Sequence, residues 1–154
     1  MITVRRATLL DAAPLADLLN AIAEARPDIG TRAISTQDMA QMMRMASDRS
    51  AWHVALNRDG ALRGFQYVEP SPILPPEACD IATFVQPGKS RLGFGSALFA
   101  QTQQVVRSLG YAWISADIGA DNESALIYYQ SRGFRPYGRS EGARMDKILM
   151  RYDI

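Results

Sequence analysis

VQPGKSRLGFGSAL, residues 85–98, joins the end of an expected strand to the start of an expected helix. Gly93 and Gly95 lie at this junction, where the unpaired backbone N–H groups of a helix N-terminus and the positive end of its dipole point to one place. Glycine lets the backbone approach an anion there because it has no Cβ. The stretch therefore suits a phosphate group, to which polar side chains can add donors or positive charge: Lys89, Ser90, Arg91 and Ser96.

Two nucleotide-binding motifs fit this stretch incompletely. The tripeptide GKS at residues 88–90 resembles the end of a P-loop, but the glycine that a P-loop requires five residues earlier is Thr83. The tripeptide GFG at residues 93–95 resembles a dinucleotide fingerprint, and Asp117 lies near the place of its ribose-binding acid. The third glycine of that fingerprint is replaced by Leu98. We reject the P-loop and keep a different ATP- or NAD-binding protein as an alternative.

The rest of the chain alternates between strand patterns and helix patterns. Asp11 is expected to cap the first helix, and the methionine-rich second helix to pack into the core through Met39, Met42, Met43 and Ala46. Asn57 to Gly60 supplies the turn of a hairpin, and four prolines in residues 69–76 predict a surface loop. The expected strands are residues 2–6, 51–56, 62–68, 81–85, 111–118, 134–137 and 145–152, and the expected helices follow Asp11, Ser35, Gly93 and Asn122.

These elements predict one domain over residues 1–154, of the α/β (α+β) class. The strand, helix and strand around the glycine stretch imply a central parallel pair. The hairpin and the alternating tail strand favour antiparallel pairing elsewhere. We therefore expect a mixed, mostly antiparallel sheet of six or seven strands, with about four helices on its faces.

Composition excludes several classes of protein. The chain has 154 residues, 17 basic against 16 acidic side chains and a formal net charge of +1, so we expect no nucleic-acid or membrane partner. Its one cysteine, Cys79, cannot form an internal disulfide, and no signal-peptide-like run begins the chain, so we expect a cytoplasmic protein. One histidine and one cysteine make a structural metal site implausible, and we expect no metal.

Two blocks of the sequence resemble the GNAT superfamily of N-acetyltransferases. Residues 85–98 are similar to the family's acetyl-CoA signature, in which Arg or Gln is followed by two residues, Gly, one residue, and Gly or Ala. Ser90 stands where the family has Arg or Gln. The second block, Asn122-x-x-Ala125-x-x-x-Tyr129-x-x-x-Gly133-Phe134, is similar to the family's last helix and the strand after it. Both blocks occur in the family's order and separation, and the start of the chain extends the resemblance over nearly its whole length.

The resemblance implies a site for acetyl-CoA as acetyl donor. In the family, the strand that ends at Phe84 and Val85 parts from its neighbour, and its free backbone groups bind the pantetheine arm. The glycine turn holds the pyrophosphate, so a bulky side chain at Gly95 is expected to abolish binding. Asn122 helps to hold the cofactor arm in the family. The implied cofactor-binding residues are Phe84, Val85, Ser90, Arg91, Leu92, Gly93, Phe94, Gly95, Ser96, Asn122 and Tyr129.

The resemblance also implies direct attack of an amine on the thioester. Tyr129 is our candidate for the general acid, because a phenol of ordinary pKa about 10 carries its proton at neutral pH. Asn122 and Tyr129 are two helical turns apart and so share a face, whereas Tyr128 points about 100° away and is expected to pack or to line the acceptor site. Asp80, at the expected start of its strand, is our candidate base, with Glu69, Glu77 or water as alternatives.

The acceptor is expected to be a primary amine, of a small molecule such as an amino acid in the first instance. Residues 25–39, the proline loop and the segment after Tyr137 are expected to form its site, and Arg26, Arg32 and Arg135 are candidates for a carboxylate clamp, with a plain exposed arginine as the alternative for each. A protein N-terminus or lysine remains an alternative acceptor. A non-catalytic acyl-CoA-binding or sensor module of the same fold remains an alternative function. The resemblance also makes a homodimer possible.

Overall fold

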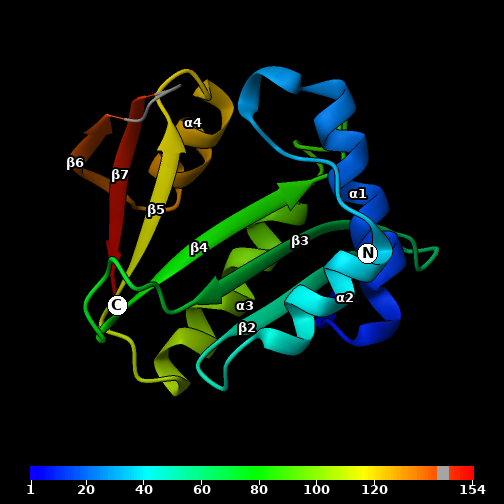
Figure 1. Ribbon diagram of the computed structural model, residues 1–154, viewed down its shortest axis with the longest axis horizontal. Coiled ribbons are helices and arrows are strands. Elements are labelled where there is room, and N and C mark those ends of the chain that lie inside the picture. Colours follow the sequence, from blue (N-terminus) through cyan, green and yellow to red (C-terminus); the bar gives the residue numbers. More distant parts are fainter. Residues whose placement is uncertain (142–145) are drawn as a thin grey trace.

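Over residues 1–141 and 146–154, which the computed structural model describes, seven strands form one sheet in the order β1-β2-β3-β4-β5-β7-β6 (Figure 1). Every neighbouring pair is antiparallel except β4 and β5. The strands are β1 Thr3–Arg6, β2 Ala51–Leu56, β3 Leu62–Glu69, β4 Ala78–Val85, β5 Trp113–Gly119, β6 Arg135–Glu141 and β7 Asp146–Asp153. The predicted mixed sheet with one central parallel pair is confirmed.

Helices cover both faces of this sheet. Their bounds are α1 Ala12–Ala25, α2 Thr36–Met45, α3 Phe94–Ser108 and α4 Glu123–Ser131, with two 3₁₀ turns at Leu9–Asp11 and Pro27–Ile29. One core lies between α1, α2 and strands β2 to β4, and a second lies between α3, α4 and the opposite face. Figure 1 shows α1 and α2 in front of the sheet and α3 behind it. No helix among the described residues is long and apolar enough to cross a membrane.

The parallel pair is short, and this shapes the middle of the molecule. Residues Ala78, Cys79 and Asp80 of β4 pair with residues 113–115 of β5, and no later residue of β4 pairs with β5. Both strands nevertheless continue, β4 to Val85 and β5 to Gly119. Figure 1 shows them diverging as the two arms of a V. We call the space between residues 81–85 of β4 and residues 116–119 of β5 the fork.

The sheet differs from the sequence expectations mainly at element ends. The strand β4 begins at Ala78 and not near Asp80, because residues 78–80 make the parallel pairing, and β5 begins at Trp113. The strand β6 begins at Arg135, one residue late, and extends to Glu141. The tail strand β7 is described from Asp146 to Asp153, and Met145, its expected first residue, lies outside the described residues.

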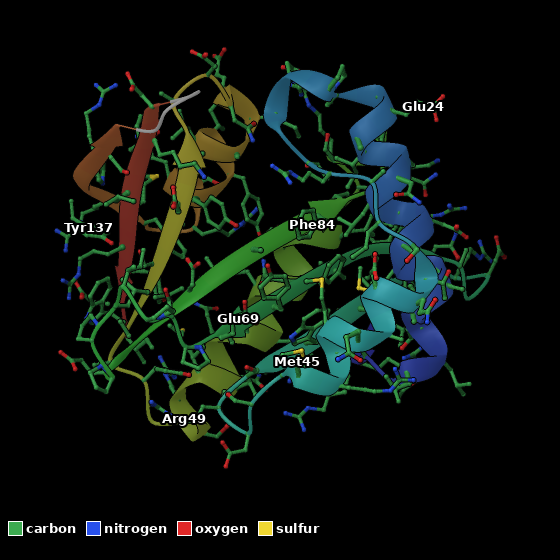
Figure 2. The ribbon with its side chains drawn as sticks, viewed as in Figure 1. Glu24, Met45, Arg49, Glu69, Phe84 and Tyr137 are labelled. Atoms are coloured by element: carbon green, nitrogen blue, oxygen red, sulfur yellow. The ribbon has the colours of Figure 1, made fainter. Side chains whose placement is uncertain are left out.

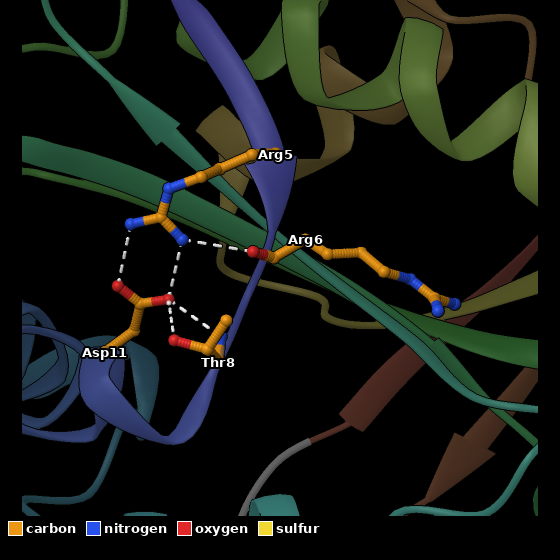
Figure 3. A network of polar contacts seen from close by, with 4 residues as sticks. All are labelled: Arg5, Arg6, Thr8 and Asp11. Carbon is orange, nitrogen blue, oxygen red and sulfur yellow. Dashed lines mark hydrogen bonds and ion pairs between the residues drawn. The ribbon is translucent and has the colours of Figure 1, made fainter.

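Two helix expectations are met only in part. Asp11 is the N-cap residue of α1, as expected, but its side chain makes no capping hydrogen bond; its carboxylate instead accepts two hydrogen bonds from Arg5, at 2.8 and 2.9 Å, and one from the N–H of Thr8 at 2.8 Å (Figure 3). Asp11 is buried, so this ion pair fastens the start of α1 to β1, and the hydrogen bond from Arg5 lowers the pKa of Asp11. In α2, Met39 is fully buried as expected, but Met42 is 43% exposed and is not part of the core.

Candidate functional site

The fork exposes one edge of β4. Residues 81–85 pair with β3 on one side only, so half of their backbone N–H and C=O groups have no partner strand on the β5 side. Phe84 and Val85, expected to bind an extended ligand through their backbones, lie in this segment. Figure 2 places Phe84 on the arm of β4 that has separated from β5. An unpaired strand edge inside a protein is suited to bind an extended chain that carries amide groups.

The N-terminus of α3 follows the fork after the connecting residues 86–93. Gly93 caps this helix with φ +94°, a conformation that side-chain-bearing residues rarely adopt. The first helical hydrogen bond runs from the N–H of Ala97 to the carbonyl of Gly93. The N–H groups of Phe94, Gly95 and Ser96 therefore precede the first bond and have no acceptor among the described residues. This end of α3 carries the partial positive charge of the helix dipole and has the donors for a phosphate group.

The side chains of the glycine stretch divide into two sets. Ser90, Arg91, Leu92 and Ser96 are exposed and surround the N-terminus of α3. Phe94 is only 4% exposed, in a small core with Ala55 and Leu98, so it offers its backbone N–H alone. Arg63 from β3 donates to the side-chain carbonyl of Gln86, which holds the start of this stretch against the sheet.

Gly95 has a role that the sequence analysis missed. A Cβ built on Gly95 would lie 2.7 Å from Cε1 of Tyr128, closer than real Cβ atoms approach other atoms. The Tyr128 hydroxyl also donates to the Gly95 carbonyl at 2.7 Å. Gly95 is therefore required for the contact of α3 with α4. A bulky residue at Gly95 would displace Tyr128. Loss of acetyl-CoA binding in such a variant would therefore not identify Gly95 as part of the phosphate site.

Tyr129 lies beside the fork but is almost completely buried. Its side chain is 5% exposed and packs against the rings of Tyr128 and Phe134. Its hydroxyl lies 2.7 Å from Oγ1 of Thr83, in the diverging arm of β4. Burial raises the pKa of Tyr129 above its usual value, so the phenol keeps its proton at neutral pH. Tyr128 contributes to packing, as expected, through Gly95.

Asp80 is the last residue of β4 that pairs with β5, so it lies at the base of the fork. Burial raises its pKa to about 6, and the nearby carboxylates of Asp117 and Glu69 act in the same direction. Glu69 is the cross-strand neighbour of Asp80, and burial raises the pKa of Glu69 as well. Glu77, the other expected alternative, is exposed in the loop before β4. Asp80 is therefore a carboxylate that can take up a proton near neutral pH.

The two candidate catalytic side chains approach the fork from opposite faces of the sheet. Side chains alternate along β4, so Cys79, Ile81 and Thr83 face α3 and α4, whereas Asp80 and Phe84 face α1 and α2. Tyr129 is on the first of these faces because it bonds to Thr83. Tyr129 and Asp80 therefore lie beside the fork on opposite faces of the sheet.

Asn122 is the N-cap of α4. Its side-chain oxygen accepts from the N–H of Ala125 at 3.3 Å and from the hydroxyl of Ser124 at 3.2 Å. The bond from Ala125 satisfies one of the free donors at the start of the helix and fixes where α4 begins. The structure therefore gives Asn122 a helix-capping contact, seven residues before Tyr129.

A set of buried polar residues near Tyr129 was not predicted. Gln66 of β3 is fully buried and bonds to Thr83, Tyr128 and Thr102. The sequence offered one signal for Gln66, its position among apolar residues of an expected strand. A polar residue buried at such a position must form hydrogen bonds with other residues. The identity of those partners depends on how β3, β4, α3 and α4 pack.

Several solved structures similar to this chain are named as acetyltransferases, some of them of the GNAT family. A GCN5-related N-acetyltransferase from Kribbella flavida is 21% identical, with TM-score 0.83 and coverage of 99% of this chain and 98% of that chain. A ribosomal-protein-alanine N-acetyltransferase from Brucella melitensis is 18% identical, with TM-score 0.84 and coverage of 99% of both chains. A GNAT superfamily phosphinothricin acetyltransferase from Sinorhizobium meliloti, solved in complex with acetyl-CoA, is 19% identical, with TM-score 0.82 and coverage of 99% of this chain and 88% of that chain.

Comparison of sequences gives no such match. No protein-family model matches this chain, and no curated protein does. The likeness therefore rests on the order and pairing of the strands and on the placement of the helices, over nearly the full length of each chain. The chain has the fold of the GNAT N-acetyltransferases.

Proposed function

We propose that this protein is an acetyltransferase that moves the acetyl group of acetyl-CoA to a primary amine. The observation that carries the proposal is the continuity of the fork with the N-terminus of α3. An unpaired strand edge at residues 81–85 leads to three N–H groups, at residues 94–96, that have no acceptor in the part of the chain that the structure describes. A ligand with an extended amide-bearing arm and a pyrophosphate matches both features. The structural relative from Sinorhizobium meliloti was solved with such a ligand, acetyl-CoA.

Acetyl-CoA supplies an activated acetyl thioester when it is bound. We propose that the backbones of Phe84 and Val85 bind its arm and that the helix N-terminus from Gly93 to Ser96 binds its pyrophosphate. Ser90, Arg91 and Leu92 border that end of α3, where Arg91 adds positive charge. Ser90 replaces the Arg or Gln of the family's signature, so backbone donors carry most of the binding. Asn122 acts by fixing the start of α4.

Asp80 and Tyr129 then each transfer one proton. Asp80 accepts a proton from the attacking amine, which makes a new N–C bond to the acetyl carbon as the C–S bond breaks. Tyr129 gives its hydroxyl proton to the departing sulfur, so that the thiol leaves uncharged. The proton on Asp80 is released to water, and Tyr129 regains one, so a neutral amine and a thioester yield an amide and a thiol. The opposite positions of the two residues across the sheet support these separate roles.

The acceptor we propose is a small-molecule amine that approaches on the Asp80 side. Asp80 and its cross-strand neighbour Glu69 place two carboxylates there, which favour an ammonium group, whereas Asp117 is paired with Lys147 at 3.8 Å. The names of the structural relatives include phosphinothricin in one case and a ribosomal-protein alanine in the other, so the fold alone does not select the class of acceptor. A panel of amines that includes amino acids and short peptides separates them.

The proposal is tested by isothermal titration of the purified protein with acetyl-CoA, with ATP and NAD as controls. We expect saturable binding of acetyl-CoA only. Release of free CoA thiol in the presence of the amine panel then identifies the acceptor. Binding of ATP or NAD instead would contradict the proposed donor. Binding of acetyl-CoA without thiol release from any amine would favour a non-catalytic acyl-CoA-binding module.

A further inference from the structure

We propose that Arg132, the residue directly after α4, binds the pyrophosphate of the donor from the α4 side of the glycine stretch. This role rests on the proposed function, because it takes the N-terminus of α3 as the place of the pyrophosphate. Arg132 lies just before Gly133, at a position that the second GNAT-like block leaves undefined. The surroundings of its guanidinium group are what distinguish it from other arginines of the chain.

Arg132 lies over the ring of Tyr128, the residue that joins α4 to α3. The two residues are four apart at the end of α4, so their side chains share one face of that helix. The guanidinium carbon of Arg132 lies 5.0 Å from the centre of the Tyr128 ring, within the range of a cation–π contact. The Tyr128 hydroxyl donates to the carbonyl of Gly95, in the first turn of α3, at 2.7 Å. One side chain thus contacts both Arg132 and the helix end proposed for the pyrophosphate.

The positive charge of Arg132 acts on the hydroxyl end of Tyr128. Burial raises the pKa of Tyr128 above its usual value, whereas a hydrogen bond from Gln66 and the charge of Arg132 act in the opposite direction. A nearby cation has this effect because it stabilises a negative charge on the phenol oxygen. That oxygen is the atom bonded to the Gly95 carbonyl. The charge of Arg132 therefore adds to the positive potential at the first turn of α3.

Arg132 has no acidic partner in the part of the chain that the structure describes. The ion pairs found there do not include it. Its side chain is only partly exposed, and its Nε is buried without a hydrogen-bond partner among those same residues. Partial burial of a guanidinium without a negative partner is unfavourable, because its N–H groups lose water and gain no acceptor in return. A phosphate beside its outer N–H groups would supply both the charge and the acceptors.

Two other arginines near the glycine stretch are less well prepared for this contact. Arg63 already donates to the side-chain carbonyl of Gln86. Arg91 is exposed, so its side chain must be ordered when a ligand binds, which costs conformational entropy. Arg132 is held beforehand by its contact with Tyr128, and its planar guanidinium has paired donors that match two phosphate oxygens. Arg132 is therefore a preorganised cation beside the proposed pyrophosphate site.

Arg132→Gln tests the contact, because it removes the charge and keeps a side chain that can pack on Tyr128. We expect the Kd of acetyl-CoA, measured by calorimetry, to rise about 10-fold through loss of a charge-assisted contact. The matched control is Arg107→Gln, an equal change of charge in the last turn of α3, with an expected change of less than about 2-fold. Equal effects of the two variants on the Kd would overturn the proposal.

Three further titrations separate a pyrophosphate contact from a packing role of Arg132. Arg132→Lys keeps the charge and loses the paired donors, so it is expected to bind acetyl-CoA only about 3-fold more weakly than wild type. Added salt screens an ionic contact, so the Kd is expected to rise less steeply with salt in Arg132→Gln than in wild type. Dephospho-CoA keeps the pyrophosphate and lacks the ribose phosphate, so its affinity is expected to fall as much as that of CoA.

Each of these titrations has an outcome that contradicts the proposal. A lysine variant as weak as the glutamine variant, or an equal salt dependence of Arg132→Gln and wild type, would assign Arg132 to packing. A loss of affinity for CoA but not for dephospho-CoA would assign Arg132 to the ribose phosphate. Any of these results would overturn the proposed contact with the pyrophosphate.

A crystal structure of the wild-type protein with CoA tests the contact even if Arg132→Gln does not fold. We expect an N–H group of Arg132 within about 3.2 Å of a pyrophosphate oxygen, and a guanidinium turned away from the pyrophosphate would overturn the proposal. A wild-type protein that does not bind acetyl-CoA would contradict the proposed function and this role of Arg132 together. Wild-type binding that Arg132→Gln leaves unchanged would contradict the role of Arg132 alone.

Discussion

The Tyr128 hydroxyl donates to the carbonyl of Gly95 at 2.7 Å, and a Cβ on Gly95 would lie 2.7 Å from the Tyr128 ring. The second glycine of the GFG tripeptide is therefore needed for the close approach of α3 and α4. The first glycine, Gly93, is needed for its φ of +94°. Two glycines that belong to one sequence motif thus meet two different physical requirements.

Gly95→Ala is expected to destabilise the fold by about 1–3 kcal/mol, because the added methyl group overlaps the Tyr128 ring and the two helices must shift. The gain in helix propensity from glycine to alanine, at most about 1 kcal/mol, opposes this cost. Urea unfolding measures the difference. Ser96→Ala, at the exposed neighbouring position, is the control and is expected to change stability by less than about 0.5 kcal/mol. A Gly95→Ala protein as stable as wild type would show that the contact can relax.

Ser96→Glu separates stability from anion binding. A carboxylate in the first turn of α3 interacts favourably with the helix dipole, so stability is expected to stay the same or rise by up to about 1 kcal/mol. The same charge repels a pyrophosphate, so the acetyl-CoA Kd is expected to rise about 10-fold or more. Calorimetry and thermal unfolding measure the two effects. Gln104→Glu, an equal charge change farther along α3, is the control. Unchanged affinity in Ser96→Glu would place the pyrophosphate elsewhere.

Tyr129→Phe removes the proposed acid with little change of shape. We expect kcat to fall about 100-fold, at the lower end of the usual contribution of a general acid, and acetyl-CoA affinity to change less than about 2-fold. Loss of the bond to Thr83 is expected to cost about 1 kcal/mol of stability, which leaves the protein folded. Stopped assays of thiol release at several pH values provide the measurement. A variant with wild-type kcat would remove Tyr129 as the acid.

Asp80 makes both activity and stability depend on pH. Burial raises its pKa to about 6, so a base at this position loses activity as the pH falls below about 6. Its folded-state pKa is above the unfolded value, so its effect on stability is most favourable below pH 4 and is lost as the pH rises through 6. Asp80→Asn is therefore expected to be more stable than wild type at pH 8, by about 1 kcal/mol or more, and inactive or slow.

Thermal unfolding of wild type and Asp80→Asn from pH 4 to pH 8 checks the stability part. The two curves are expected to converge at the acid end. Asp59→Asn, in the exposed turn after β2, is the control and is expected to show no such pH-dependent difference. A constant difference across the pH range would contradict the assignment of the titration to Asp80. A rate that stays pH-independent near 6 would favour water as the proton acceptor.

Much of the fold was predictable because its signals are local. The turn Asn57 to Gly60 and its flanking apolar residues determined the hairpin of β2 and β3. Ser35 caps α2 as predicted, by accepting from the N–H of Asp38. The strand–helix–strand unit required a parallel pair, which is β4 with β5. Each of these depends on residues within a few positions of one another, where periodicity, capping and turn geometry decide the backbone.

Packing between segments distant in sequence decided which residues meet at the site. The bonds of Gln66 to Thr83 and of Tyr128 to Gly95 join residues 17 and 33 apart in sequence, and those of Thr83 to Tyr129 and Gln66 to Tyr128 join residues 46 and 62 apart. No local pattern encodes these distances. The burial that raises the pKa of Asp80 and Tyr129 arises in the same way.

The amino-acid sequence by itself determined the order of the elements, the glycine stretch before α3 and the tyrosine that follows Asn122 by two helical turns. Only the tertiary structure decided that β4 and β5 part after Asp80, that Gly95 must be small for the sake of Tyr128, and that Gln66 bonds to Thr83, which in turn bonds to the Tyr129 hydroxyl. The reason is physical: local backbone preferences act over a few residues, whereas burial and hydrogen-bond satisfaction act on whatever the completed fold brings together.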